Sequence, residues 1–149
     1  MKRNTRVVAA VIAGIASVIL SASLACTWAI ANGASMRWRI LFRVFCHGIP
    51  ERCLDVWGVP MPICARCTAI YVGLLAGILV FVILPRLEEI TARWILGFSA
   101  VPMFLDGVTQ LVHLRASTNP LRIETGLIAG AAFALWALSA VESHVLSTA

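Results

Sequence analysis

Five side chains near the middle of the chain belong to the types that bind transition metals or exchange disulfides. They are Cys46, His47, Cys53, Cys64 and Cys67. The last two form a Cys-x-x-Cys pair, and two thiolates at this spacing bind one metal ion, usually zinc, when other segments add ligands. The same pair at a helix N-terminus is typical of a redox dithiol. The spacing therefore predicts a metal site or a redox dithiol, and thiols without a function are the remaining reading.

A metal site here would take its ligands from two segments of the chain. The predicted ligands are Cys46, His47, Cys64 and Cys67. Three thiolates and one imidazole complete a closed zinc site, which is typical of structural zinc because catalytic sites keep an open position. Neighbouring residues are sterically awkward as joint ligands, so Cys53 is the predicted substitute for one of the first two. Zinc is the cofactor that this pattern predicts.

A second group of polar residues interrupts the apolar second half of the chain. The costliest is Asp106, because a charge near the middle of a membrane costs about 2.5–3.5 kcal/mol on insertion scales. It must be protonated, paired or exposed to water, and Arg122 and His113 are its predicted partners. One reading makes Asp106 a general acid or base, with Arg122 binding an anion. The other is a buried ion pair that locks the third span to the fourth.

Helical periodicity places several of these side chains together. At about 100° per residue, Asp106, Gln110 and His113 share one face of a helix. The residues predicted for catalysis are Asp106, Gln110 and Arg122. Those predicted to line a pocket for a small polar or anionic ligand are Arg66, Tyr71, Asn119 and Thr125.

The composition is that of an integral membrane protein. The chain has 149 residues, of which 60% are hydrophobic and 13% charged, and its mean hydropathy is +0.92. Soluble domains carry about 25% charged residues, so this deficit predicts helices that cross a bilayer. The net charge of +5 comes from basic residues at span ends and in one amphipathic stretch, which favours contact with the lipid bilayer through anionic headgroups. Nucleic acid is not a predicted partner, because no basic residues interleave with aromatic ones on a soluble surface.

We expect an all-α, four-helix integral membrane bundle that forms a single membrane domain over residues 1–149. The predicted spans are about residues 7–31, 63–84, 94–114 and 121–141. Residues 36–45 combine arginines four apart with aromatic side chains, which predicts a short amphipathic helix in the headgroup plane. Residues 46–62 are rich in proline and glycine and predict a loop. Pro62 is expected in the first turn of the second span, and Asn119 is the predicted N-cap of the fourth.

The alternation of four spans brings the polar residues to one end of the bundle. The second helix leaves that end, the third returns to it, and the fourth starts from it. The cysteine-containing loop, the end of the third span and the start of the fourth therefore meet there. The orientation stays open, because the basic residues before the first span favour an inside N-terminus, whereas the arginines at the other end are more numerous.

Two Gly-x-x-x-Gly pairs lie in the second and fourth predicted spans. They are Gly73 with Gly77 and Gly126 with Gly130. Small residues at this spacing give a helix a smooth face that another helix can approach closely. The main prediction is close packing within the bundle, and a homo-oligomer formed through the same GxxxG faces is the alternative.

Ordered motifs over about residues 46–130 resemble those of one family. They read Cys46-His47-x-x-Pro50-x-Arg52, Pro62-x-Cys64-Ala65-Arg66-Cys67-Thr68-x-x-Tyr71-x-Gly73, Pro102-x-x-x-Asp106-Gly107-x-x-Gln110 and Thr118-Asn119-x-x-Arg122-x-x-Thr125-Gly126. This pattern is similar to the domain of unknown function 2085 family of small predicted membrane proteins in bacteria and archaea, with mild departures at Gly48 and Ala69. The resemblance implies a shared polar set and a multi-pass protein of the prokaryotic cell (inner) membrane. It implies no reaction.

Three functional classes fit these patterns. The leading hypothesis is a membrane protein with a Cys/His zinc site next to a polar Asp/Gln/Arg pocket at one membrane face. The second is a membrane thiol–disulfide oxidoreductase that uses Cys64 and Cys67. The third is a non-enzymatic membrane adaptor or a small transporter subunit, although four spans are few for an alternating-access carrier. The sequence contains no nucleotide-binding loop, hydrolase elbow or zincin helix, so whether the protein is an enzyme stays open.

Overall fold

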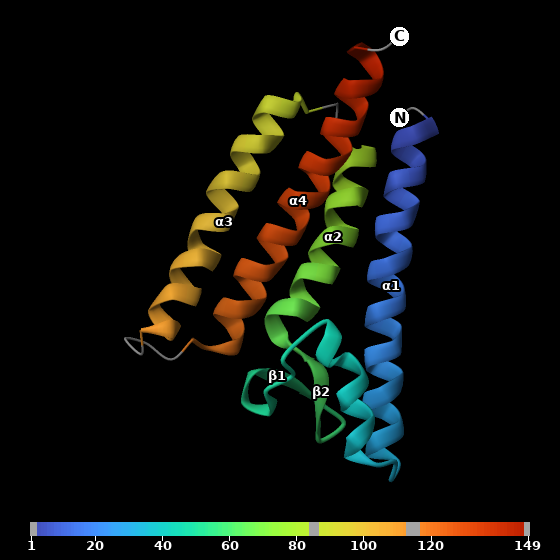
Figure 1. The fold of residues 1–149 in the computed structure, drawn as a ribbon, viewed down its shortest axis with the longest axis vertical. Coiled ribbons are helices and arrows are strands. Elements are labelled where there is room, and N and C mark those ends of the chain that lie inside the picture. Colours follow the sequence, from blue (N-terminus) through green and yellow to red (C-terminus); the bar gives the residue numbers. More distant parts are fainter. Residues whose placement is uncertain (1–2, 84–86, 113–116, 148–149) are drawn as a thin grey trace.

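A computed structural model describes residues 3–83, 87–112 and 117–147, most of which are helical (Figure 1). The long helices are α1 (Arg3–Ala31), α2 (Ala65–Ile83), α3 (Glu89–Leu111) and α4 (Asn119–Ser147). The segment between α1 and α2 contains the 3₁₀-helices η1 (Met36–Val44) and η2 (Pro50–Arg52) and the strands β1 (Cys53–Val56) and β2 (Val59–Cys64). The long helices lie side by side in the order α3, α4, α2, α1, and β1 and β2 lie below the start of α2.

Three of the long helices are long and apolar enough to cross a membrane. These candidate spans are α1, α2 and residues Asn119–His144 of α4. Within its described residues, α3 is not among them, and it carries Arg93, Pro102 and Asp106 between its apolar residues. The fold is thus mostly helical with three candidate spans, and a fourth span remains a prediction.

The helix boundaries differ from the predicted spans by a few residues. Helix α3 begins at Glu89, five residues before the predicted start, and α4 continues beyond residue 141 to Ser147. The predicted ends of the second and third spans, at residues 84 and 114, lie outside the described residues. Caps and charged ends extend helices beyond their apolar part, so hydropathy alone places such boundaries poorly.

Helices α2 and α4 approach each other until their backbones touch. All four glycines of the two predicted faces lie on this contact, and a Cβ added at any of them would come within 2.7 Å of a carbonyl oxygen on the other helix. For Gly130 that distance is 2.3 Å, to the carbonyl oxygen of Ile70. The predicted close packing of the two glycine faces therefore occurs within one chain, and a homo-oligomer remains a prediction.

The segment predicted as a loop over residues 46–62 contains an antiparallel hairpin instead. Cys53 lies opposite Cys64, and Val56 lies opposite Val59. Both turn residues, Trp57 and Gly58, have positive φ, as a two-residue type I′ turn requires. The prolines concealed the second strand, since proline is excluded only from central strands, and both strands of a two-stranded sheet are edges.

Helix α2 begins later than the sequence predicted. Pro62 lies in β2, and the helix begins three residues later at Ala65, so the prediction that Pro62 opens the helix is wrong. Strand β2 is held against α1, because Met61 and Ile63 are buried in a cluster with Ile19 of α1. This packing fixes the hairpin, and with it the cysteines, against the end of the long helices.

The predicted short helix over residues 36–45 is present in 3₁₀ form. It begins after Ser35, whose hydroxyl oxygen accepts a hydrogen bond from the backbone N–H of Arg37 at 3.3 Å. None of its residues is buried. It connects the end of α1 to Cys46 and runs beside the hairpin (Figure 1).

Candidate metal centre and its polar surroundings

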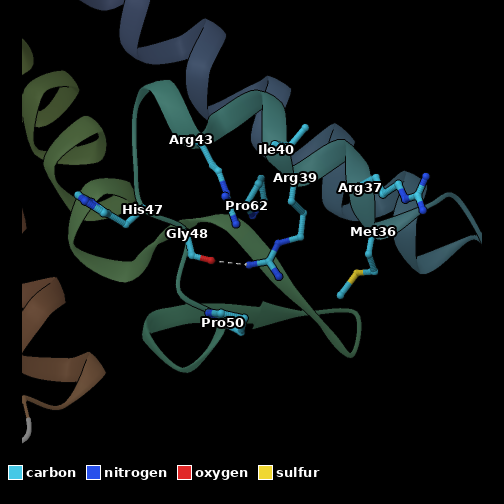
Figure 2. A pocket seen from close by; sticks show the side chains of 9 residues that line it. All are labelled: Met36, Arg37, Arg39, Ile40, Arg43, His47, Gly48, Pro50 and Pro62. Carbon is cyan, nitrogen blue, oxygen red and sulfur yellow. Dashed lines mark hydrogen bonds between the residues drawn. The ribbon is translucent and has the colours of Figure 1, made fainter.

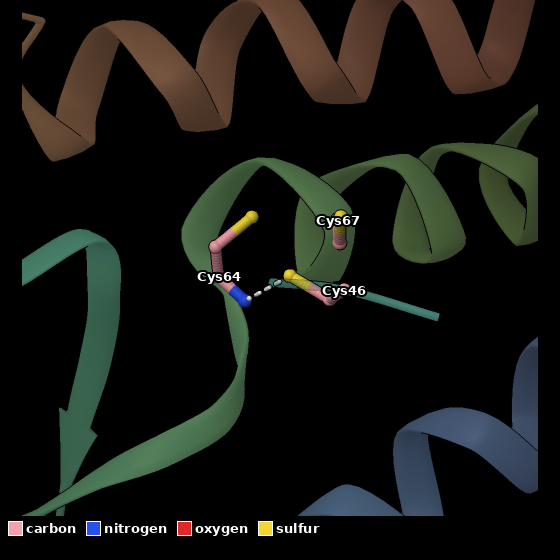
Figure 3. Close-up of side chains that lie close together, drawn as sticks. All are labelled: Cys46, Cys64 and Cys67. Carbon is pink, nitrogen blue, oxygen red and sulfur yellow. Dashed lines mark hydrogen bonds between the residues drawn. The ribbon is translucent and has the colours of Figure 1, made fainter. Parts of the chain in front are cut away.

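Three cysteines come together where the hairpin ends and α2 begins. The sulfur atoms of Cys46, Cys64 and Cys67 all lie within 4.8 Å of one another (Figure 3). Cys46 follows η1, Cys64 is the last residue of β2, and Cys67 lies in the first turn of α2. The strand-to-helix junction sets the spacing of the Cys-x-x-Cys pair, and the connection from η1 adds the third thiol.

Backbone groups are aimed at the sulfur of Cys46. It accepts hydrogen bonds from the N–H of Cys64 at 3.2 Å and from the N–H of Gly48 at 3.5 Å (Figure 3 shows the first). The second bond depends on a left-handed backbone at Gly48 (φ 58°), where a Cβ would also come within 2.8 Å of the carbonyl oxygen of Pro62. These two donors hold the sulfur of Cys46 in place beside the start of α2.

The neighbours of Cys64 favour its thiolate. A hydrogen bond from the Cys67 thiol is the largest cause that lowers the pKa of Cys64 to about 5, and burial opposes it. The backbone N–H groups of Cys67 and Arg66, at the start of α2, lower this pKa further. The first turn of a helix offers such unpaired N–H groups, and Arg66 and Cys67 lie in the first turn of α2, directly after Cys64.

The donor set fits a thiophilic metal ion. In a tetrahedral zinc site with Zn–S bonds of about 2.3 Å, the sulfur atoms lie about 3.8 Å apart. Three sulfur atoms already within 4.8 Å of one another need only small side-chain adjustments to reach that spacing. Thiolates select zinc or copper(I) over the harder magnesium and calcium ions.

Two other predicted ligands lie outside this group of three. The thiol of Cys53 donates to the carbonyl oxygen of Ile49 at 3.1 Å, and the guanidinium of Arg39 lies 3.8 Å from its sulfur. Burial raises the pKa of Cys53 to about 11, so this thiol is protonated at neutral pH. His47 is exposed and is not part of the group. Their roles as a substitute ligand and as a fourth ligand remain predictions.

The three sulfur atoms border an open cavity. It has a volume of about 360 Å³ and is lined by the three cysteines together with His47, Arg52 and Arg66. No acidic side chain lines it. The cavity therefore combines three soft metal ligands with three groups that can bind an anion.

Arg66 connects this cavity to the second polar group. Its guanidinium forms an ion pair with Oδ2 of Asp106, which is buried. The same oxygen accepts hydrogen bonds from Nε2 of Gln110 at 3.0 Å and from the hydroxyl of Ser117 at 2.9 Å. The sequence reading proposed Arg122 or His113 as the partner of Asp106. Asp106 forms its ion pair with Arg66 instead, and His113 lies outside the described residues.

Arg122 continues the network towards the hairpin. It is buried, and its guanidinium donates to Oε1 of Gln110 at 3.3 Å and to Oδ1 of Asn119 at 2.9 Å. Asn119 in turn donates to the carbonyl oxygen of Cys53 at 3.2 Å. The side chain of Asn119 thus bonds to the hairpin and to Arg122, and its role as the N-cap of α4 remains a prediction. These bonds tie α2, α3, α4 and β1 together at one end of the molecule, as the alternation of the spans predicted.

The last two predicted pocket residues have local partners. Thr125 is buried, and its hydroxyl donates to the carbonyl oxygen of Leu121 in its own helix at 2.8 Å. Tyr71 packs against the apolar cluster that contains Met61 and Ile63. Neither lines the cavity beside the thiols, so a role in ligand binding stays a prediction for both. Ser117 was not among the predicted site residues, yet its hydroxyl donates directly to Asp106. The only sequence signal for this contact was the position of Ser117 just before α4.

Comparisons with known proteins place most of the chain in one group. A family model described as "Predicted membrane protein (DUF2085)" matches residues 46–136. An uncharacterised protein of Methanocaldococcus jannaschii is 37% identical over 120 residues, which is 74% of this chain and 77% of the relative. A second, from Methanothermobacter thermautotrophicus, is 37% identical over 105 residues, or 70% of this chain and 93% of the relative. No solved structure matches significantly. The matched segment includes the three thiols and the polar network.

Proposed function

The chain belongs to the DUF2085 family of predicted membrane proteins, and we propose that it is a four-helix, multi-pass protein of the prokaryotic inner membrane that binds one zinc ion through Cys46, Cys64 and Cys67. The observation that carries this proposal is the approach of three sulfur atoms to within 4.8 Å of one another from two separate segments. A tetrahedral metal ion requires its thiolate ligands to lie this close together, and the third thiol here comes from a separate segment.

The fourth span of this proposal is α3. Its side chains Trp94, Phe98 and Phe104 are 62%, 72% and 69% exposed, which in water would be an unfavourable apolar surface. Lipid around the helix would remove that cost. The one acid in its second half, Asp106, is turned inward and ion-paired, which is the arrangement expected of an acid in a membrane helix.

The fourth coordination position of the proposed zinc ion decides what the centre can bind. Three thiolates from the chain leave one position of a tetrahedral ion facing the cavity, and exchangeable sites keep such a position. We infer that a small anion binds in this cavity, where Arg52 and Arg66 supply positive charge. When bound, zinc would act on that ligand as a Lewis acid.

The buried network has a positioning role in this proposal. Oδ2 of Asp106 already has three donors, and its carboxylate holds the guanidinium of Arg66 at the edge of the cavity. Gln110 donates to that carboxylate, and Arg122 of α4 in turn donates to Gln110. A general acid–base role for Asp106 is the alternative, and it predicts an activity that Asp106→Asn abolishes.

Elemental analysis of the full chain, purified in detergent without chelator after growth with zinc, tests the metal site. We expect about one zinc per chain, lost in the Cys64→Ser/Cys67→Ser double variant. Cys26→Ser is the matched control, because Cys26 lies in α1 outside the group of three, and it should retain the ion. A wild-type protein without metal, or a double variant that keeps it, would contradict the proposal.

A thiol–disulfide oxidoreductase is the second candidate, and the lowered pKa of Cys64 favours it. In that reaction the Cys64 thiolate attacks a partner disulfide, and one partner thiolate leaves. The Cys67 thiolate then attacks the Cys64 sulfur and releases the second thiolate of the partner. Two electrons have then passed to the partner, and a Cys64–Cys67 disulfide has formed. A metal-free preparation whose Cys64 is alkylated far faster than Cys26 and Cys53 near neutral pH, and which reduces a model disulfide, would support this candidate over zinc.

A further inference from the structure

A second, larger cavity lies on the other side of the connection that carries His47. It has a volume of about 540 Å³ and lies between η1 and the chain around Gly48, Pro50 and Pro62 (Figure 2). The η1 residues that line it are Met36, Arg37, Arg39, Ile40 and Arg43. Three arginines thus line one cavity, and no acidic side chain does.

The three arginines that line this cavity differ in their hydrogen-bond partners. Arg39 is held by the protein, because its guanidinium donates to the carbonyl oxygens of Gly48 at 3.2 Å and Met61 at 3.0 Å (Figure 2 shows the first). Within the described residues, Arg37 and Arg43 form no side-chain hydrogen bond or ion pair with the chain. Their charges are therefore available to a ligand, whereas Arg39 fixes the wall of the cavity.

Exposed apolar side chains lie on the same short helix as the arginines. Trp38, Leu41 and Val44 of η1 are 58%, 60% and 86% exposed, and Met36 and Ile40 line the cavity itself. This helix follows directly from α1, a candidate membrane span. A short helix with arginines and exposed apolar side chains at the end of a span lies at the level of the lipid headgroups.

We propose that this cavity binds the phosphate of an anionic phospholipid, with Arg37 and Arg43 on the phosphate and the exposed apolar side chains of η1 against the acyl chains. Guanidinium groups match phosphate oxygens in geometry as well as charge. An anionic amphiphile matches both the unpaired arginines and the exposed apolar side chains of η1, whereas a free phosphate matches only the first. This site is separate from the proposed zinc centre, because it shares only His47 and Gly48 with the cavity beside the thiols.

Native mass spectrometry of the full chain in detergent, titrated with phosphatidylglycerol or phosphatidylcholine, tests the proposal. An arginine near a membrane surface contributes about fivefold to the binding of anionic lipid. We therefore expect the Arg37→Gln/Arg43→Gln variant to bind phosphatidylglycerol about 25-fold more weakly than wild type. The matched control is Arg3→Gln/Arg6→Gln, which removes the same charge from the other end of α1 and should change this affinity less than twofold.

Further arms separate a lipid site from other sources of binding. Ile40→Ser should weaken phosphatidylglycerol binding severalfold by removing apolar contact, and inorganic phosphate at millimolar concentration should not displace the lipid. Equal binding of the two lipids, an equal loss in both arginine double variants, or full displacement by inorganic phosphate would overturn the assignment. Zinc content should be unchanged in the Arg37→Gln/Arg43→Gln variant, so the result is independent of the metal proposal.

Discussion

The contact between α2 and α4 and the polar end of the molecule hold the same helices together by different means. The α2–α4 contact contains small residues whose backbones touch, with no side chain between them at Gly73 and Gly130. The polar end instead uses hydrogen bonds and an ion pair among Arg66, Asp106 and their neighbours. The first contact fixes the distance between two helices, and the second fixes the rotation and register of three. Only the second places charged groups beside the thiols.

A substitution in the glycine contact should have the largest effect on stability. In Gly130→Ala the new Cβ would lie 2.3 Å from the carbonyl oxygen of Ile70, so the helices must separate. We expect a loss of about 3 kcal/mol or more, at the upper end for overpacked sites, measured as a lower melting temperature in detergent. Gly97→Ala is the control, because nothing lies within 4 Å of that position. Equal melting temperatures for the two variants would show that the α2–α4 contact is looser than described.

Removal of the buried carboxylate should have the next largest effect. Asp106→Asn leaves Arg66 without its counter-ion, and we expect a loss of about 2 kcal/mol, below the usual cost of breaking a fully buried pair because Arg66 is partly exposed. Arg66→Gln combined with Asp106→Asn should cost less than the sum of the two single changes. Zinc content should stay unchanged in all three variants, and loss of zinc in Asp106→Asn would mean that the network supports the metal directly.

The hydrogen bond between α4 and the hairpin should contribute less to stability than the buried ion pair. Asn119→Ala removes the donor to the carbonyl oxygen of Cys53 and the acceptor for Arg122, and we expect a loss of about 1 kcal/mol. Asn32→Ala is a suitable control, because that side chain donates only to its own helix, at the carbonyl oxygen of Trp28. A melting temperature for Asn119→Ala that matches the control would argue that the hairpin is held by its apolar contact with α1 alone.

A change of pH should alter the thiols while leaving the glycine contact intact. The pKa of Cys64, lowered to about 5, means that its thiolate predominates above that pH and is lost as the pH falls through it. Because zinc binds thiolates and protons compete with it, zinc retained after dialysis should fall as the pH is lowered. In metal-free protein, the alkylation rate of Cys64 should rise as the pH rises through about 5, while Cys53, with a pKa of about 11, stays slow at neutral pH. A midpoint of Cys64 alkylation near pH 9 would contradict this account.

The convergence of the polar residues at one end was predictable because it depends on topology. Antiparallel helices of similar length bring the end of α3 and the start of α4 to the start of α2, whatever their rotation. The Cys-x-x-Cys spacing placed Cys64 and Cys67 together, and the hairpin between Cys46 and α2 brings the third thiol to them. The partner of Asp106 was missed because rotation decides it. Arg66 and Arg122 both lie at that end, and the ion pair formed is with Arg66.

The sequence by itself determined which segments are apolar helices, which residues meet at one end, and which thiols are available to a metal, because periodicity and chain connectivity act locally. Only the tertiary structure decided that a proline-rich loop forms a hairpin, that Cys53 stays outside the thiol group, and that Arg66 pairs with Asp106. These outcomes depend on packing against α1 and α4, where contacts between residues far apart in the chain outweigh local preference. The physical reason is that a local pattern fixes the face on which a side chain lies, while the closeness of two helices decides which group it reaches.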